Sequence, residues 1–127
     1  MTATIIDGNP IAERLRADIA RDAAAFKSEF GYQPGLGVVL VGDDPASQMY
    51  VRMKRRACES VGVISYAHIL PSDATQTEVE TAVRTLNDDP KVHGILVQLP
   101  LPKHIDEDQV LRIIDFEKDA DGAHPLN

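Results

Sequence analysis

The chain lacks the features that mark several common protein classes. It has a single cysteine, Cys58, so no disulfide can form within it, and unpaired thiols are usual in reducing compartments. No apolar run approaches the ~20 residues that a membrane-spanning helix needs. Residues 1–15 have neither the basic segment nor the long apolar segment of a signal peptide. We therefore expect a cytoplasmic protein without a membrane partner.

Basic residues and phosphate-binding glycines are also scarce. Lysine and arginine together number 13 against 20 aspartates and glutamates, which gives a net charge of −7. This balance argues against nucleic acid as the main partner. The glycine-rich turn that binds nucleotide phosphates is missing, because residues 41–47 (VGDDPAS) contain one glycine. The four histidines show no paired metal-ligand spacing. We expect neither a metal site nor a nucleotide site in this chain.

What the chain does contain is a regular alternation of strand-like and helix-like segments. Its 127 residues, 43% of them apolar and 26% charged, are enough for one domain with its own core. Apolar runs predict strands, and three- and four-residue spacing predicts helices. Strands are expected at 5–6, 36–41, 63–70 and 92–98, and helices near 9–30, 45–61, 75–88 and 106–114. Connections too long for hairpins favour a parallel sheet, so we predict a three-layer α/β domain with helices on both faces of the sheet.

The segment 41–62 leads from a strand into a helix that carries the most informative residue, Lys54. Helical spacing places six residues on one face, which we expect to be buried: Ala46, Met49, Tyr50, Met53, Ala57 and Val61. Lys54 lies at the edge of this stripe, one turn after Tyr50. One interpretation is a surface lysine with its stem on apolar residues and its ammonium in water. The other is a lysine in a partly desolvated cleft, where burial favours the neutral amine that can act as a base.

Two further polar residues are candidates for the site. Gln98 ends a predicted strand, and Asp121 lies near the end of the sequence. Ligands of parallel sheets bind beyond the carboxyl ends of the strands. Gln98 ends a strand there, before Leu-Pro-Leu-Pro, and its amide either meets loop backbone or faces the crevice and bonds a lysine amine. Asp121 lies in the turn-like sequence Asp-Ala-Asp-Gly. This sequence starts like a calcium loop, but no bidentate glutamate follows at the required distance, so we expect no metal there.

Three segments in order resemble one known family. They are VGDDPASQMYVRMKRRACESVGV, GILVQLPLPKHID and KDADGAHPLN, supported by IIDGNPIAERL and GLGVVLVG. Together they are similar to the bifunctional methylenetetrahydrofolate dehydrogenase/methenyltetrahydrofolate cyclohydrolase family over essentially the whole chain. The resemblance implies that residues 1–127 are the N-terminal catalytic domain. It also implies a folate cleft between this domain and an NAD(P)-binding domain that we expect to lie outside this chain.

The resemblance assigns roles to individual residues. It implies that Lys54 is the catalytic lysine, that Gln98 hydrogen-bonds it, and that Tyr50 lies against the folate ring system. It implies that Asp121 recognises the amino and ring N–H groups of the pterin. Two neighbours of Gln98 are expected to flank the pocket, and these are Val97 and Leu99. We expect tetrahydrofolate derivatives as ligands, NADP held by the second domain, no metal, and a homodimer.

The implied function is the interconversion of 5,10-methylene-, 5,10-methenyl- and 10-formyl-tetrahydrofolate in one-carbon metabolism, which supplies purine biosynthesis. Two alternatives stay open. The first is a stand-alone module that binds a pterin or a protein partner without turnover. The second is the substrate domain of another two-domain dehydrogenase, such as a shikimate or amino-acid dehydrogenase. Two positions depart from the family pattern, since relatives commonly have a small residue in place of Met53 and a bulkier one in place of Ala123. The chain also stops where the linker to the NAD(P)-binding domain is expected.

Overall fold

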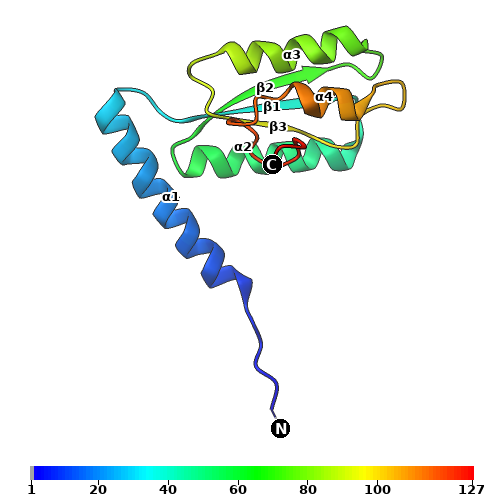
Figure 1. Cartoon of the computed structure of the whole chain (residues 1–127). Helices are drawn as coiled ribbons and strands as arrows, with labels where there is room; N and C mark the ends of the chain where they lie inside the picture. The colour runs from blue at the N-terminus through cyan, green and yellow to red at the C-terminus, as the bar shows by residue number, and fades with distance from the viewer. Residues whose placement is uncertain (1) are drawn as a thin grey trace.

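The computed structural model describes residues 2–127, in which helices and strands alternate as the sequence predicts (Figure 1). The helices are α1 (Gly8–Phe30), α2 (Pro45–Ser60), α3 (Gln76–Asp88) and α4 (Glu107–Ile113). The strands are β1 (Gly35–Val41), β2 (Ile64–Leu70) and β3 (Gly94–Val97). In this part of the chain, no helix is long and apolar enough to cross a membrane.

The three strands form one parallel sheet in the order β2-β1-β3. β1 pairs with β2 along its whole length, from Gly35 with Ile64 to Val41 with Leu70. It pairs with β3 from Leu36 with Gly94 to Val39 with Val97. The predicted α/β class with a parallel sheet is therefore confirmed.

One predicted strand was wrong. Residues 2–7 contain no strand, and the side chains of Ile5 and Ile6 are 89% and 87% exposed. The β-branched side chains of Ile5 and Ile6 favour a strand, but a strand forms only where a neighbouring strand accepts and donates its backbone hydrogen bonds. This segment precedes α1, which projects away from the sheet (Figure 1).

Two apolar layers cover the two faces of the sheet. Alternate residues of a strand point to opposite faces, so Val39 and Ile95 join the core beneath α3 and α4, while Val38 and Leu96 join the core beneath α2. Helix α3 contributes the four residues that its spacing predicts, which are Val79, Ala82, Val83 and Leu86. The arrangement is three-layered, with α2 on one face and α3 and α4 on the other (Figure 1).

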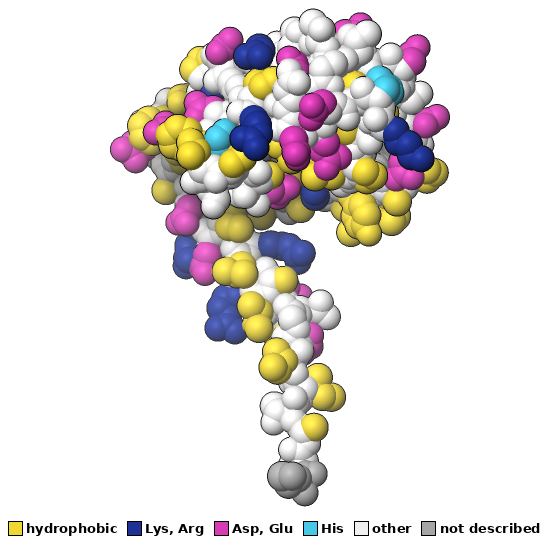
Figure 2. All heavy atoms as spheres, turned by 45° about the vertical axis from the view of Figure 1, so that its right-hand side comes forward, with side chains coloured by type: hydrophobic (Ala, Val, Ile, Leu, Met, Phe, Trp, Pro, Cys, Tyr) yellow, Lys and Arg dark blue, Asp and Glu magenta, His cyan; other side chains and the backbone are white. Residues whose placement is uncertain are grey.

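Helix α1 packs against the rest of the molecule through its C-terminal half, where Ala23 is buried. Its N-terminal end is capped by the side chain of Asp7, and it ends at Gly31, whose φ of 81° suits glycine. Most of its apolar stripe is exposed, including Ile11, Leu15 and Ile19 at 48%, 57% and 47%. Figure 2 shows these hydrophobic side chains along the projecting helix.

An aromatic cluster joins the end of α1 to the sheet. The ring of Phe26 meets Tyr32 and His93 edge-on, with centroid distances of 5.5 and 5.2 Å. Tyr32 and His93 stack at 6.0 Å. His93 also accepts a hydrogen bond at Nδ1 from the backbone of Gly35 at 3.0 Å. This cluster fixes the start of β1 and the end of α1 to each other.

Helix α2 buries a different face from the one that its apolar spacing predicts. Met49, Tyr50 and Met53 are 49%, 51% and 58% exposed, whereas Ser47 and Val51 are buried. The sheet therefore covers the neighbouring side of the helix and leaves the apolar stripe uncovered beside Lys54. Spacing locates the apolar residues of a helix but does not say which of its sides another element covers.

We predict that Gly35→Ala destabilises the domain. A Cβ at Gly35 would collide with the carbonyl oxygen of Lys91 and approach the ring of Tyr66. We expect a loss of about 1–3 kcal/mol in the free energy of unfolding, measured by urea denaturation. Gly8→Ala is the matched control, because a Cβ at Gly8 meets nothing within 4 Å. Equal stability of the two variants would contradict the close packing around Gly35 at the start of β1.

Candidate functional site

The structure brings Lys54 and Gln98 into direct contact. Lys54 lies on the shoulder of α2, and Gln98 directly follows β3, 44 positions later. The ammonium Nζ donates a hydrogen bond to Gln98 Oε1 at 3.0 Å, and both residues are half-buried. The contact forms where the carboxyl end of β3 meets the side of α2, so a helix and a neighbouring strand together build this pair.

The amide of Gln98 is held in one orientation. Its backbone N–H donates to the carbonyl of Val39 at 2.8 Å, and its side-chain Nε2 donates to the carbonyl of Leu99 at 3.1 Å. This leaves Oε1 as the acceptor that faces Lys54. The lysine forms no ion pair with a carboxylate within residues 2–127. A carboxylate would favour the charged ammonium, whereas a neutral amide accepts a hydrogen bond without adding a counter-charge.

Tyr50 lies one helical turn before Lys54 on the uncovered side of α2. Its side chain is 51% exposed, and no hydrogen bond of its phenol occurs in the described part of the chain. The exposed side chains of Met49 and Met53 lie on the same stripe. The stripe therefore offers an apolar, partly aromatic surface next to the amine of Lys54.

The two expected pocket neighbours of Gln98 differ in exposure. Val97 is 4% exposed and packs in the core beneath α3, so only its backbone is available at the crevice. Leu99 is 37% exposed and follows Gln98 into the loop. Of these two side chains, Leu99 alone can contact a ligand directly.

Asp121 lies in an exposed turn and makes no hydrogen bond among the residues that the structure describes. The segment before it runs parallel to β3, through an isolated bridge between Ile95 and Asp119. The backbone of Ile95 donates to Lys118 at 2.6 Å and accepts from Ala120 at 3.1 Å. Asp121 therefore follows the outer edge of β3 in the direction of Gln98. No hydrogen bond or ion pair joins Asp121 to Lys54 or Gln98 in residues 2–127.

Sequence reasoning did not identify Lys118, which anchors this turn. Its Nζ donates to three carbonyls at the C-terminal end of α3: Asn87 at 2.7 Å, Asp89 at 3.0 Å and Leu86 at 3.5 Å. The last carbonyls of a helix lack partners within it and favour a cation. Lys118 thus ties the turn that carries Asp121 to α3.

Asp119 was also missed, although it shapes the same turn. Its carboxylate accepts hydrogen bonds from the backbone of His124 at 2.8 Å and Ala123 at 3.1 Å, and from the side chain of Asn127 at 3.0 Å. Partial burial acts to raise the pKa of Asp119, but these hydrogen bonds outweigh it and hold the pKa below its usual range. An aspartate just before a glycine turn is the one sequence signal for this role.

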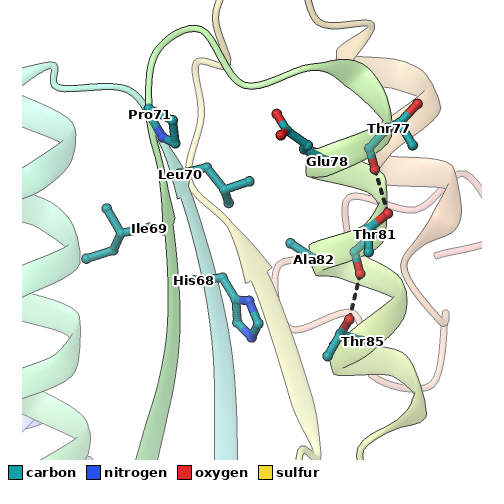
Figure 3. Close-up of a pocket in the computed structure, with 9 residues that line it drawn as sticks. All are labelled: His68, Ile69, Leu70, Pro71, Thr77, Glu78, Thr81, Ala82 and Thr85. Atoms are coloured by element: carbon teal, nitrogen blue, oxygen red, sulfur yellow. Dashed lines mark hydrogen bonds between the residues drawn. The ribbon is translucent and has the colours of Figure 1, made fainter.

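A large cavity lies elsewhere. Its volume is about 550 Å³, and it lies between β2 and α3, away from Lys54 and Gln98 (Figure 3). Because it contains none of the predicted site residues, we assign the site by its chemistry rather than by cavity size. In residues 2–127, no group of three or more histidine, cysteine, aspartate or glutamate side chains is placed to hold a metal ion.

Comparison with known families gives one match over most of the chain. A family profile described as "Tetrahydrofolate dehydrogenase/cyclohydrolase, catalytic domain" matches residues 6–121. The bifunctional protein FolD of Moorella thermoacetica is 54% identical over 127 residues, which are 100% of this chain and 45% of that protein. The bifunctional protein FolD of Ralstonia nicotianae is also 54% identical, over 100% of this chain and 44% of that protein. The chain spans less than half the length of these curated relatives.

Solved structures give the same result. The bifunctional FolD methylenetetrahydrofolate dehydrogenase/cyclohydrolase of Campylobacter jejuni has a TM-score of 0.93 at 44% identity, over 97% of this chain and 43% of that one. The Trypanosoma brucei methylenetetrahydrofolate dehydrogenase-cyclohydrolase, complexed with NADP cofactor and inhibitor, has a TM-score of 0.94 at 38% identity. The match includes 100% of this chain and 43% of the Trypanosoma brucei chain.

We predict that acid loosens the turn around Asp119. The pKa of the Asp119 carboxyl is lower in the folded chain than in the unfolded chain, where an aspartate has a pKa of about 3.9. The carboxylate therefore stabilises the fold at pH values above the unfolded pKa. This contribution is lost as the pH falls through the folded pKa. We expect the protection factor of the Ala123 amide, which is its exchange rate compared with that of an unstructured peptide at the same pH, to fall below about pH 4. The measurement is hydrogen exchange with NMR detection.

Two variants test the assignment to this carboxyl. Asp119→Asn should abolish the acid transition of the Ala123 amide, because its side chain does not titrate in this range. Asp115→Asn is the control, since Asp115 accepts a separate backbone bond from Glu117, and it should leave that transition unchanged. An acid transition that persists in Asp119→Asn would disprove the assignment.

Proposed function

The chain belongs to the tetrahydrofolate dehydrogenase/cyclohydrolase family, and on this basis we propose that it is the catalytic, folate-binding domain of an enzyme that interconverts 5,10-methylene-, 5,10-methenyl- and 10-formyl-tetrahydrofolate. The observation that carries the proposal is the 3.0 Å contact between Lys54 Nζ and Gln98 Oε1, formed without a carboxylate partner. It supplies an oriented amine beside an exposed aromatic surface.

The cyclohydrolase step needs a base, and Lys54 fits this role. Water adds to the cationic methenyl carbon between N5 and N10, and the neutral amine of Lys54 takes a proton from it. The carbon–N5 bond then breaks as N5 takes a proton from the lysine ammonium, the remaining hydroxyl proton leaves to solvent as the formyl carbonyl forms, and 10-formyl-tetrahydrofolate is the product. Gln98 Oε1 holds the amine in place for both proton transfers. Positioning of this kind accounts for much of the rate gain in enzymes.

Tyr50 and Asp121 would hold the substrate around that amine. The exposed ring of Tyr50 offers a flat apolar surface for the pterin or benzoyl ring. The carboxylate of Asp121 has free acceptor oxygens that suit the adjacent amino and ring N–H groups of a pterin. Lys118 and Asp119 fix the turn that presents this carboxylate. Tetrahydrofolate derivatives are therefore the ligands that we propose.

The described residues do not fit the phosphates of NADP. Anions bind at helix N-termini that are free of negative charge. Here each helix begins beside a carboxylate: Asp7, Asp44, Glu78 and Asp106. We propose that hydride transfer to NADP uses a nucleotide-binding domain outside residues 2–127, and we assign no step of that transfer to this chain.

We predict that Lys54→Met removes cyclohydrolase turnover without unfolding the domain. Methionine keeps the apolar stem of the lysine but has no amine, so we expect a loss of about 100-fold or more. The measurement is the loss of methenyltetrahydrofolate absorbance in a chimera that carries residues 1–127 in place of the matching segment of the Moorella thermoacetica protein.

Lys91→Met is the matched control, because Lys91 is exposed and far from α2 in the sequence. Both variants should melt within a few degrees of the parent chimera. Normal turnover in a folded Lys54→Met chimera would exclude the general-base role. Folate binding without turnover in the parent chimera would instead favour the pterin-binding module.

We also predict that Gln98→Glu lowers turnover more than Gln98→Ala does. A carboxylate in contact with Lys54 favours the charged ammonium, which cannot act as a base, whereas alanine only removes the acceptor that orients the amine. We expect a rate at least tenfold lower for Gln98→Glu than for Gln98→Ala, measured with the same absorbance assay in the chimera. Equal rates for the two variants would show that the charge of the group in contact with Lys54 does not influence the chemical step.

A further inference from the structure

His124 is half-buried, whereas the other residues of the segment 120–127 are exposed. It lies three positions after Asp121, on the far side of the turn that carries that carboxylate. Its backbone N–H donates to Asp119 Oδ2 at 2.8 Å. Asp119 and His124 therefore close the turn from its two sides, with Asp121 between them.

The imidazole of His124 forms two hydrogen bonds with backbone groups. Leu126 N–H donates to Nδ1 at 3.1 Å, and Nε2 lies 3.1 Å from the carbonyl oxygen of Arg112. A backbone N–H can only donate a hydrogen bond, and a carbonyl can only accept one. Nδ1 must therefore be bare while Nε2 carries the proton, so the two partners together select one neutral tautomer.

The bond to Arg112 ties the turn to α4. Arg112 belongs to the last turn of this helix, where the carbonyl groups lack an N–H donor within the helix. Val110 of the same helix is 0% exposed and belongs to the core beneath α3 and α4, so α4 is a firm attachment point. The ring of Phe116 lies beside the imidazole, with a centroid distance of 6.4 Å.

The turn is thus fixed on both flanks. Lys118 ties its first flank to the end of α3, and His124 ties its second flank to the end of α4. Asp121 lies between these anchors and makes no hydrogen bond of its own among the described residues. The position of its carboxylate therefore depends on the two anchors.

We propose that His124 is a positioning residue for folate binding. Its neutral Nε2–H tautomer holds the turn to α4 and thereby places the Asp121 carboxylate for the N–H groups of a pterin. This inference rests on the proposed function, because it takes Asp121 as the group that recognises the pterin. Binding to a carboxylate that is already held in place does not have to order the turn as well. In this role His124 acts through Asp121 and takes no part in the proton transfers at Lys54.

The first test is a double-mutant cycle in the chimera with the Moorella thermoacetica protein, with KM and kcat for methenyltetrahydrofolate as readouts. We expect His124→Ala to raise KM about fivefold, the order of one lost hydrogen bond, and to change kcat less than KM. Asp121→Ala should also raise KM. In that background His124→Ala should have little further effect, because the anchor no longer has a carboxylate to place.

Two results of this cycle would overturn the positioning role. One is a KM of His124→Ala equal to that of an active parent chimera, and the other is an additive effect of the two substitutions on KM. Either result leaves the proposed function standing. A parent chimera without turnover would instead reject the proposed function, and the role of His124 with it.

Two amide variants separate the two bonds of the imidazole. The side-chain nitrogen of glutamine is as many bonds from the backbone as His124 Nε2, so His124→Gln can still donate to Arg112. The side-chain oxygen of asparagine corresponds to Nδ1, so His124→Asn can still accept from Leu126 but cannot reach α4. We expect His124→Gln to restore KM to within about twofold of the parent and His124→Asn to resemble His124→Ala. Rescue by His124→Asn but not by His124→Gln would overturn the anchor on α4.

His104→Ala is the matched control for the loss of an imidazole–carbonyl bond. His104 Nε2 bonds the carbonyl of Ala74 at 2.7 Å, outside the turn that carries Asp121. His104→Ala should leave KM unchanged, and its chimera should melt within a few degrees of the His124→Ala chimera. An equal rise of KM in both variants would attribute the effect to general loosening of the domain and overturn the proposal.

Nitrogen NMR of the imidazole ring gives a readout that is independent of activity. It distinguishes a protonated ring nitrogen from a bare one. In the 127-residue chain at about pH 8.5, where an ordinary imidazole is neutral, we expect His124 Nε2 to be protonated and Nδ1 to be bare. A proton on Nδ1, or an equal mixture of the two tautomers, would contradict both backbone bonds and refute the role of His124.

Discussion

Both halves of the Lys54–Gln98 contact depend on burial of β1. This strand is paired on both sides and packed on both faces, and Val38 and Val39 are 1% and 0% exposed. Helix α2 starts directly after it, so the cap at Asp44 sets how far along the sheet Lys54 lies. Gln98 is bonded to β1 through its backbone N–H. A shift of β1 would therefore move the amine and its acceptor relative to each other.

The fold was predictable where local signals and burial agree. Helix α3 shows this best. The Thr-Gln-Thr-Glu sequence at residues 75–78 has the spacing of a capping box, the next apolar residues have helical spacing, and both features are present in the structure. The covered side of α2 was not predictable, because apolar spacing cannot say that Met49 and Met53 stay exposed while Ser47 is buried. The Ile5–Ile6 strand failed for a related reason, since propensity does not supply a partner strand.

The candidate site, like the fold, was predictable only in part. Helical spacing placed Lys54 at the edge of its stripe and strand length placed Gln98 at a carboxyl end, but their pairing was implied by family resemblance. Lys118 gave no local signal, because its acceptor Asn87 lies 31 positions earlier and becomes a neighbour only in the folded chain. No hydrogen bond or ion pair joins Asp121 to Lys54 within residues 2–127. The candidate site therefore combines one hydrogen-bonded pair with a carboxylate whose turn is held by other contacts.

The attachment of α1 at one end has a mechanical consequence. Helix α1 is held from its buried residue Ala23 onwards and by the cluster of Phe26, Tyr32 and His93. At a rise of about 1.5 Å per residue, the 15 residues before Ala23 project about 22 Å. A tilt of about 5° where α1 is held displaces its N-terminal end by about 2 Å, since the displacement is the product of length and angle. Small changes in the packing around Ala23 and the aromatic rings are therefore enlarged at the N-terminal end of α1.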